Sequence, residues 1–254
     1  MVIIVDLDYT LLNSEQEISK RTQNCFIRVK KAGHKVIINS ARSFQRSKKI
    51  AEKIDADLIN CFYGNLLLDK NHKTIFSRGV GSVILGDLIN DFKSVYSGWI
   101  GIETVDGAFG TEEDICRKMG AELVKEGDLL KFEAFKIVFE IDPNNPQIDR
   151  AKDIAKKYNL DVKFAREGYF CSFLPKDTNK WNGIKMALNL MGEEFGSSVA
   201  FGDEVSDLET FKNVDIAVAM KNSTPEILSQ IENVTKYDNN QDGVAHWLEE
   251  NLNI

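Results

Sequence analysis

Short runs of apolar, mostly β-branched residues recur towards both ends of the chain, and amphipathic segments lie between them. The apolar runs, which predict strands, are residues 2–5, 35–39, 58–62, 199–201 and 216–219. The amphipathic segments, which predict helices, are residues 20–32, 44–54, 180–191 and 224–231. Strands that alternate with helices favour a parallel sheet. The pattern therefore predicts an α/β fold with a doubly wound, Rossmann-like parallel sheet, whose ligands sit beyond the carboxyl ends of the strands.

The middle of the chain breaks this alternation. Its pattern predicts, in order, a helix (80–96), a strand (99–105), a helix (112–124), a strand (135–141), a helix (147–158) and two close strands (162–165 and 169–173). This order of elements is typical of an α+β unit with its own core. We therefore expect a discontinuous α/β core domain of residues 1–78 and 174–254, with an inserted α+β cap domain of residues 79–173.

Composition and charge narrow the classes of function. The 254 residues are 43% hydrophobic, which is enough for a real core, and the formal net charge is -7. A negative protein repels nucleic acid and anionic membrane surfaces, so neither is an expected partner. No apolar stretch approaches the ~20 residues of a membrane span, and we expect a cytoplasmic protein. Its four cysteines and three histidines are scattered, which argues against a disulfide scaffold or a zinc site.

Two carboxylates end the first predicted strand in the segment IIVDLDYTLL. Asp6 and Asp8 stand two residues apart, and a hydroxyl follows at Thr10. The two-residue period of a strand lets both carboxylates face one site. Acids this close repel unless one is protonated or a cation lies between them, so a hard metal ion is an economical explanation. Two solvated loop aspartates are the alternative for this motif taken alone.

A second strand end carries a hydroxyl, in the segment VIINSAR. Ser40 is followed by the small Ala41 and by Arg42, and a hydroxyl with adjacent backbone N–H groups can hold phosphoryl oxygens. Taken alone, a serine here is more often a helix N-cap.

Two further segments add acids and a cation near the end of the chain. In VAFGDEVSDL, Asp203 is placed to ligate the same metal, and Asp207 to orient a ligand or water, although an acid in a first helical turn is also favoured by the helix dipole. Lys180 begins a predicted helix where the core resumes. An isolated lysine is usually a surface charge, but three carboxylates and a phosphate need a fixed cation beside a divalent ion.

These four segments, with the insert between the second and the third, resemble the haloacid dehalogenase superfamily, in particular its Cof-like (type IIB) branch with a large α+β cap. The resemblance spans essentially the whole chain. It implies a Mg²⁺-dependent phosphatase of a small phosphorylated metabolite, such as a sugar phosphate, with Asp6 as the nucleophile and Asp8 as the acid/base. It implies that Asp6, the backbone carbonyl of Asp8 and Asp203 hold the metal ion.

By the same resemblance, Ser40, the backbone around Ala41, and Lys180 grip the phosphoryl group. Arg42 stands where the family has an arginine that positions substrate, and a structural salt bridge is an equal alternative. Ser206 replaces the family's usual asparagine and offers a shorter hydroxyl. Three more departures put the shape of the phosphate pocket in doubt: Tyr9, Tyr63 and Trp181.

Other functions stay open at this point. A sugar phosphomutase of the phosphomannomutase type shares the chemistry, and a non-catalytic phospho-ligand-binding protein shares the fold. Two other classes fit the sequence less well. A receiver domain needs neither Asp8 nor the insert. A glycosyltransferase with a DxD motif would not account for Ser40, Lys180 and Asp203 together. The sequence of the cap does not identify the substrate. Residues 166–168, at a predicted hairpin turn of the cap, are candidate reader residues for the substrate. The sequence does not indicate the oligomeric state either.

Overall fold

The computed structural model describes residues 1–93, 98–141, 148–165, 170–191 and 198–254. The chain divides into two compact units, one of residues 1–76 and 179–254 and the other of residues 77–178. The second unit is a few residues wider at each end than the expected 79–173. One reason is that strand β11 (Phe170–Pro175) continues to Pro175, where it still pairs with Leu160.

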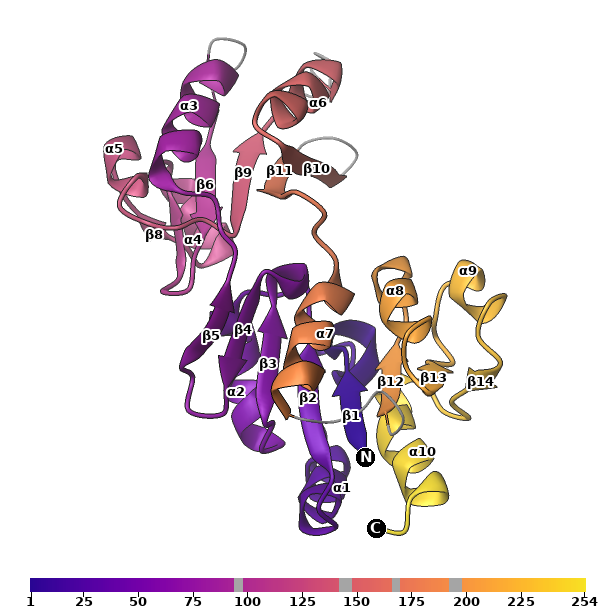
Figure 1. Ribbon diagram of the computed structural model, residues 1–254. Coiled ribbons are helices and arrows are strands. Elements are labelled where there is room, and N and C mark those ends of the chain that lie inside the picture. Colours follow the sequence, from indigo (N-terminus) through magenta and orange to yellow (C-terminus); the bar gives the residue numbers. More distant parts are fainter. Residues whose placement is uncertain (94–97, 142–147, 166–169, 192–197) are drawn as a thin grey trace. The chain divides into compact units, whose positions relative to one another are not determined.

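The first unit is built on an eight-stranded sheet with the order β14-β13-β12-β1-β2-β3-β4-β5. From β14 to β3 the neighbouring strands run parallel, whereas β4 pairs antiparallel with β3. The strands are β1 (Val2–Val5), β2 (Lys35–Asn39), β3 (Leu58–Cys61), β4 (Leu66–Asp69), β5 (Thr74–Ser77), β12 (Ser198–Gly202), β13 (Ile216–Ala219) and β14 (Asn233–Val234). This is the predicted doubly wound core, seen with its strands labelled in Figure 1.

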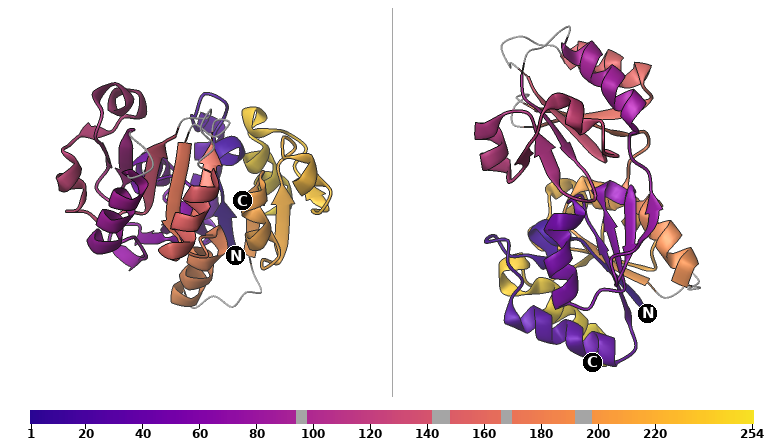
Figure 2. Two further views of the ribbon diagram at one scale, coloured as in Figure 1. Left: turned by 90° about the horizontal axis from the view of Figure 1, so that it is seen from above. Right: turned by 90° about the vertical axis from the view of Figure 1, so that its left-hand side faces the viewer.

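Helices cover both faces of this sheet, as the edge-on view in Figure 2 shows. The helices of the first unit are α1 (Lys20–Lys31), α2 (Phe44–Lys53), α7 (Lys180–Met191), α8 (Leu208–Phe211), α9 (Pro225–Leu228) and α10 (Gly243–Asn251). On one face, Trp181 and Ile184 of α7 and Phe211 of α8 pack against Ile4 and Ile37 of the central strands. On the other face, α1 contacts α10. Burial of the central strands, such as β1 and β12, on both faces explains why their sequences are nearly continuous apolar runs.

The second unit is an α+β structure with its own core. Its six-stranded, mostly antiparallel sheet has the order β10-β11-β9-β6-β7-β8. The remaining elements are α3 (Ser82–Lys93), β6 (Ile100–Glu103), β7 (Ala108–Gly110), α4 (Glu113–Met119), β8 (Glu122–Leu123), α5 (Glu126–Leu129), β9 (Lys136–Glu140), α6 (Ile148–Lys157) and β10 (Leu160–Ala165). Apolar side chains of α3 and α6, among them Phe92 and Ile154, form one cluster with Phe139 and Phe173 of the sheet.

Several predicted elements differ from the structure. The helix expected over residues 112–124 ends at Met119, because Gly120 takes a left-handed φ of 67° and the chain then forms β8. The hairpin of β4 and β5 and the helix α10 were not predicted. In β4 the three leucines Leu66, Leu67 and Leu68 have no alternation that would distinguish a strand from a buried helix.

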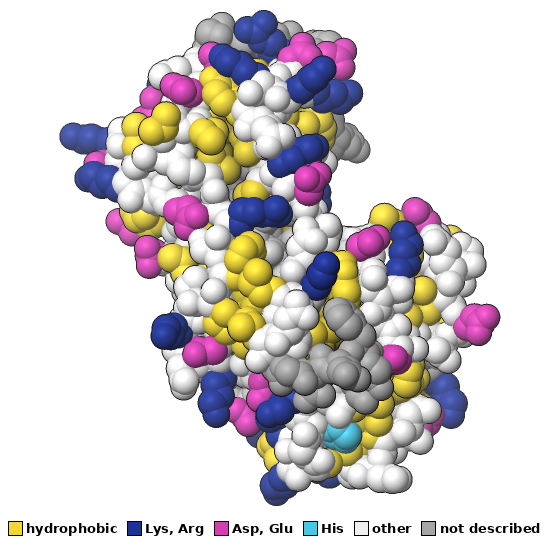
Figure 3. All heavy atoms as spheres, in the orientation of Figure 1, with side chains coloured by type: hydrophobic (Ala, Val, Ile, Leu, Met, Phe, Trp, Pro, Cys, Tyr) yellow, Lys and Arg dark blue, Asp and Glu magenta, His cyan; other side chains and the backbone are white. Residues whose placement is uncertain are grey.

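Charges of both signs are mixed on the surface. On the face drawn in Figure 3, basic and acidic side chains are interspersed among the described residues, and no continuous basic stripe runs across it. None of the described helices is both long and apolar enough to cross a membrane. The candidate reader residues 166–168 lie outside the described residues.

Candidate active site

The carboxyl end of the core sheet carries the acids and the hydroxyl that the sequence singled out. Asp6 follows β1, Ser40 follows β2 and Asp203 follows β12, and these three strands are adjacent and parallel. The Asp6 amide donates a hydrogen bond to the carbonyl of Phe201, which continues the ladder between β1 and β12 past the last paired residues. The parallel register therefore brings residues from distant parts of the sequence to one edge.

Three carboxylates gather at this edge. Among the described residues, Asp6, Asp203 and Asp207 each offer an oxygen, and these oxygens lie within 4.8 Å of one another. Burial raises the pKa of Asp6 well above its ordinary value of 3.8, which Lys180 opposes and Asp207 and Asp203 reinforce. Burial also raises the pKa of Asp203 to about 7 against a hydrogen bond from Thr10, and Asp207 adds to the increase. Burial and the neighbouring acids therefore both oppose ionisation of Asp6 and Asp203.

Lys180 is the cation in contact with this cluster. Its ammonium donates to Asp6 Oδ1 and to Asp207 Oδ1, each at 2.9 Å, and its side chain is only 1% exposed. Burial disfavours the charged ammonium, but Asp207 and Asp6 outweigh this effect and raise the pKa of Lys180 above its usual range. Lys180 is therefore a buried charged residue of the site and not a surface lysine.

Local structure fixes the position of Lys180 at the first residue of α7. The Asn179 side chain accepts a hydrogen bond from the Asn182 amide, an N-cap that explains why the helix begins here. Asn60 of β3 donates from its side chain to the Lys180 carbonyl at 2.9 Å and to Asn39 at 2.8 Å. Gly183 allows this close approach, since a Cβ there would lie 1.8 Å from Asn60 Oδ1. The start of α7 is thus bonded directly to the sheet.

Thr10 supports Asp203 from the turn that follows β1. Residues Leu7–Leu11 form a single wide turn in which the Leu12 amide donates to the Leu7 carbonyl at 2.9 Å. The buried Thr10 hydroxyl donates to Asp203 Oδ1 at 2.9 Å. This hydrogen bond orients the Asp203 carboxylate, which explains why a residue with a hydroxyl group stands two positions after Asp8.

The two carboxylate oxygens of Asp207 bind different partners. Its Oδ2 atom accepts from the amides of Asp203 and Glu204 at 3.2 and 3.3 Å, while its Oδ1 atom receives Lys180. Gly202 permits this arrangement, because a Cβ there would lie 2.4 Å from the Asp207 carboxyl carbon. Asp207 therefore orients both the lysine and the loop that carries Asp203.

Ser40 and Ala41 form a short loop at the end of β2. Ser40 is fully buried, and its Oγ atom accepts a hydrogen bond from the Arg42 amide at 3.1 Å, while its own amide donates to the Asn60 carbonyl. The hydroxyl uses a lone pair in this contact, so its proton can be donated to a ligand. Ala41 is half-buried beside it.

Asp8 is bound by Arg42 and lies outside the carboxylate cluster. The guanidinium donates through Nε to Asp8 Oδ2 at 2.7 Å and through Nη2 to Asp8 Oδ1 at 2.5 Å, the two-pronged geometry of a strong ion pair. This ion pair is a salt bridge of the kind considered for Arg42. Ser206, half-buried, donates to Glu204 Oε1 at 2.7 Å.

Sequence reasoning missed the polar residues beneath the site. Asn39 and Asn60 are buried partners across β2 and β3, and Gln16 also hydrogen-bonds to Arg42. A signal for the two asparagines existed, since each is a polar residue inside an apolar strand. Gln16 stands in an ordinary polar loop and carried no such signal.

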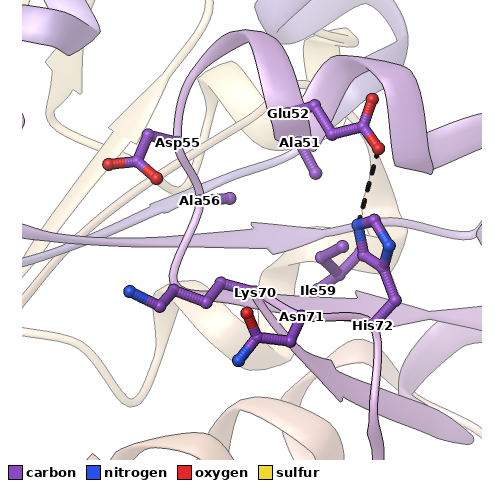
Figure 4. Close-up of a pocket in the computed structure, with 8 residues that line it drawn as sticks. All are labelled: Ala51, Glu52, Asp55, Ala56, Ile59, Lys70, Asn71 and His72. Carbon is purple, nitrogen blue, oxygen red and sulfur yellow. Dashed lines mark ion pairs between the residues drawn. The ribbon is translucent and has the colours of Figure 1, made fainter.

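A separate pocket of about 310 Å³ lies at the opposite, amino end of the parallel strands. It is lined from the end of α2, the start of β3 and the β4–β5 turn. Figure 4 shows Glu52 and His72 next to each other on one side of it, and their charged atoms lie 3.7 Å apart. It contains none of the predicted site residues, so it is not part of the candidate active site.

The amino-acid sequence matches the haloacid dehalogenase-like hydrolase family over residues 3–248, and the chain belongs to that family. A 5-amino-6-(5-phospho-D-ribitylamino)uracil phosphatase of Bacillus subtilis (strain 168) is 24% identical, over 98% of this chain and 97% of its own length. Among solved structures, a haloacid dehalogenase-like hydrolase from Bacteroides thetaiotaomicron has a TM-score of 0.85 at 20% identity, covering 98% of each chain. A subclass IIB sugar phosphatase has a TM-score of 0.76 at 14% identity, also over 98% of each chain.

The family match confirms the resemblance to haloacid dehalogenase-like hydrolases, and the chain is a phosphoric monoester hydrolase, as the resemblance implied. The likeness to the subclass IIB sugar phosphatase shows a shared fold. This outcome removes the receiver, glycosyltransferase and non-catalytic alternatives.

Proposed function

We propose that this phosphatase hydrolyses a small phosphorylated metabolite through an aspartyl-phosphate intermediate on Asp6. The observation that carries the proposal is the position of the Asp6 carboxylate. It is buried, it stands in the carboxylate cluster, and it contacts the Lys180 ammonium. A nucleophile needs this combination of fixed orientation and nearby positive charge, because attack on a phosphate brings two anions together.

In this mechanism the two aspartates of the first motif have different tasks. An Asp6 oxygen attacks phosphorus, and the bond to the leaving oxygen breaks as Asp8 gives that oxygen a proton. Asp8 then takes a proton from the water that hydrolyses the aspartyl phosphate, which regenerates Asp6. The Arg42 contacts use one lone pair on each Asp8 oxygen and leave another on each for the proton.

The donor set at the cluster fits Mg²⁺. Carboxylate oxygens are the ligands that this ion prefers, and the proximity of three acidic side chains supports a cation at this position. Asp6 and Asp203 would hold the ion, with the backbone carbonyl of Asp8 as the resemblance implies, while Asp207 stays paired with Lys180. When bound, Mg²⁺ supplies charge neutralisation for the phosphoryl group.

Lys180, Ser40 and the backbone at Ala41 would hold the phosphoryl oxygens. The Asp6 and Asp207 carboxylates take two of the three N–H donors of Lys180, and the third is assigned to the phosphoryl group. The Ser40 proton is assigned to it as well. Arg42 and Ser206, which the resemblance also placed there, hold other partners in this structure.

For the substrate, we propose a phosphomonoester of a small metabolite, with a sugar phosphate first among the candidates. This is supported by the similarity to a subclass IIB sugar phosphatase and to a phosphatase of a phosphoribityl compound. The unit of residues 77–178 is proposed to act as the cap that selects the substrate. A cytoplasmic location belongs to the same proposal and agrees with four buried, unpaired cysteines.

A sugar phosphomutase is the second candidate, because it would use the same phosphorylated aspartate and acid/base. It differs in the fate of the phosphoryl group, which returns to a sugar hydroxyl and not to water. Release of inorganic phosphate from a panel of phosphomonoesters, with and without a sugar bisphosphate, separates the two functions.

The mechanism is tested by intact-protein mass after mixing with an activated aryl phosphate and Mg²⁺. Asp6→Asn should show neither turnover nor an added phosphoryl group. Asp8→Asn keeps the nucleophile and should accumulate the phosphoryl adduct, since the base that activates water is missing. Phosphorylation of Asp6→Asn at the wild-type rate would falsify the nucleophile assignment.

A further inference from the structure

Gln16 has a backbone conformation that its residue type rarely adopts. Its φ is 65°, in the left-handed region, where non-glycine residues are uncommon and the enriched ones are Asn, Asp and His. Such a conformation costs about 1 kcal/mol or more and is found where the surroundings hold it, often at functional sites. Gln16 is exposed, yet its side chain bonds to a buried arginine.

The loop around Gln16 is closed by other groups. The Asn13 side chain accepts hydrogen bonds from the amides of Glu15 and Glu17 at 3.0 and 2.9 Å. The Gln16 amide donates to the Asn13 carbonyl at 2.9 Å, and the Asn13 amide donates to Glu17. The turn therefore does not depend on the Gln16 side chain, whose amide group is available for another purpose.

The side-chain amide of Gln16 contacts Arg42. The Gln16 Oε1 atom accepts a hydrogen bond from Arg42 Nη2, the same nitrogen that donates to Asp8 Oδ1. The second donor of the guanidinium, Nε, binds the other Asp8 oxygen. Because the guanidinium is planar and rigid, a third contact on it fixes the plane in which the Asp8 carboxylate lies.

We infer that Gln16 is a positioning residue for the proton-transfer steps, acting on Asp8 through Arg42. This inference rests on the proposed role of Asp8 as the acid/base. Proton transfer needs the carboxyl group within hydrogen-bond reach of the leaving oxygen and in line with it, and small displacements are costly. Loss of the Gln16 side chain leaves the ion pair in place but frees it to pivot.

The test uses substrates whose leaving groups differ in acidity, with the whole 254-residue chain. Gln16→Gly removes the amide and suits the left-handed backbone, so the fold is retained. His72→Gly is the matched control, because His72 has the same φ of 65° in a turn at the opposite end of the sheet. For each variant, kcat/KM is measured with phenyl phosphate and with p-nitrophenyl phosphate, whose leaving group needs less protonation.

We expect Gln16→Gly to lower kcat/KM for phenyl phosphate about tenfold while p-nitrophenyl phosphate loses less than about threefold, in keeping with partial loss of acid catalysis. His72→Gly should change neither. In an Asp8→Asn background, Gln16→Gly should have no further effect on either substrate, since both act on one step. Equal losses on the two substrates, or no loss, would overturn the inference.

The Asp8→Asn single variant separates a failure of the role inferred for Gln16 from a failure of the acid/base assignment of Asp8. If Asp8→Asn makes kcat/KM strongly dependent on the acidity of the leaving group and Gln16→Gly does not, only the role of Gln16 is refuted. If Asp8→Asn itself leaves the dependence unchanged, the acid/base assignment fails and the role of Gln16 fails with it.

Discussion

The ammonium nitrogen of Lys180 lies 2.9 Å from the Oδ1 atom of Asp6, and both side chains are almost completely excluded from solvent. The pair is separated by 174 positions in the sequence. Since each partner depends on the other for its charge, a change at either should affect stability as well as chemistry.

Replacing the lysine tests this dependence. Lys180→Met leaves Asp6 and Asp207 buried without a cation, and we expect the free energy of unfolding to fall by about 3 kcal/mol in the presence of chelator, together with loss of activity. Urea denaturation measures the change. Lys30→Met is the control, because Lys30 pairs with Asp57 in a more exposed position and its loss should cost no more than about 1 kcal/mol. Equal costs for the two variants would contradict the prediction.

Stability of the metal-free protein should depend on pH through Asp203. Its pKa rises from 3.8 to about 7 on folding, mainly through burial. Protonation therefore stabilises the fold fully below the lower value, and this contribution is lost as pH rises through the higher one. Mg²⁺ binds the deprotonated carboxylate, so the increase in Tm on adding Mg²⁺ should grow from about pH 5.5 to about pH 8.5. In Asp203→Asn the increase should be small at every pH. A constant increase in the unmodified protein would refute the account.

Thr10 should influence metal affinity without touching substrate. Thr10→Val removes the hydrogen bond to Asp203, and loss of such a supporting contact weakens metal binding by about 10- to 100-fold. Isothermal titration with Mg²⁺ measures the change. Thr22→Val is closely matched, since Thr22 is also buried and donates to an aspartate, Asp242, at 2.9 Å. It should leave the affinity unaltered, and a similar loss there would assign the effect to general destabilisation.

Gly183 should tolerate no side chain while Asn60 is present. A methyl group would meet Asn60 Oδ1, and relief of the contact must move the start of α7 and Lys180 with it. We expect Gly183→Ala to lower both Tm and kcat. The double variant Gly183→Ala with Asn60→Ala removes the obstruction and should recover part of the Tm, as thermal unfolding by circular dichroism would show. No recovery would mean that another contact limits residue 183.

Much of this architecture could be predicted, because its signals are local. Strands such as Val2–Val5 are short apolar runs, and Asp6, Ser40 and Asp203 each follow one directly. Parallel pairing then places all three at one edge without further information. The helix that begins at Lys180 was readable from its period, and the structure forms it over the expected residues.

The partners of the polar groups could not be predicted, since they are set by packing between distant segments. The sequence left two roles for Arg42, and only the fold brings its guanidinium to Asp8, 34 positions away. Lys180 was expected to face the phosphate, whereas the structure also gives it two carboxylates. The β4–β5 hairpin was missed because the leucine run of β4 has no alternation to distinguish a strand from a buried helix.

The pairing of β1 with β12 has a consequence for the way the protein folds. Val2 lies beside Ser198, so the central pair of the core sheet closes a loop of nearly two hundred residues, whereas strands of the second unit pair over much shorter separations. Contacts of high sequence separation form late and slowly. Asp6 and Asp203 come from the two sides of that long loop, so the enzyme acquires its chemistry only when the core sheet closes. A partly synthesised chain that ends before β12 can contain a folded second unit but no active site.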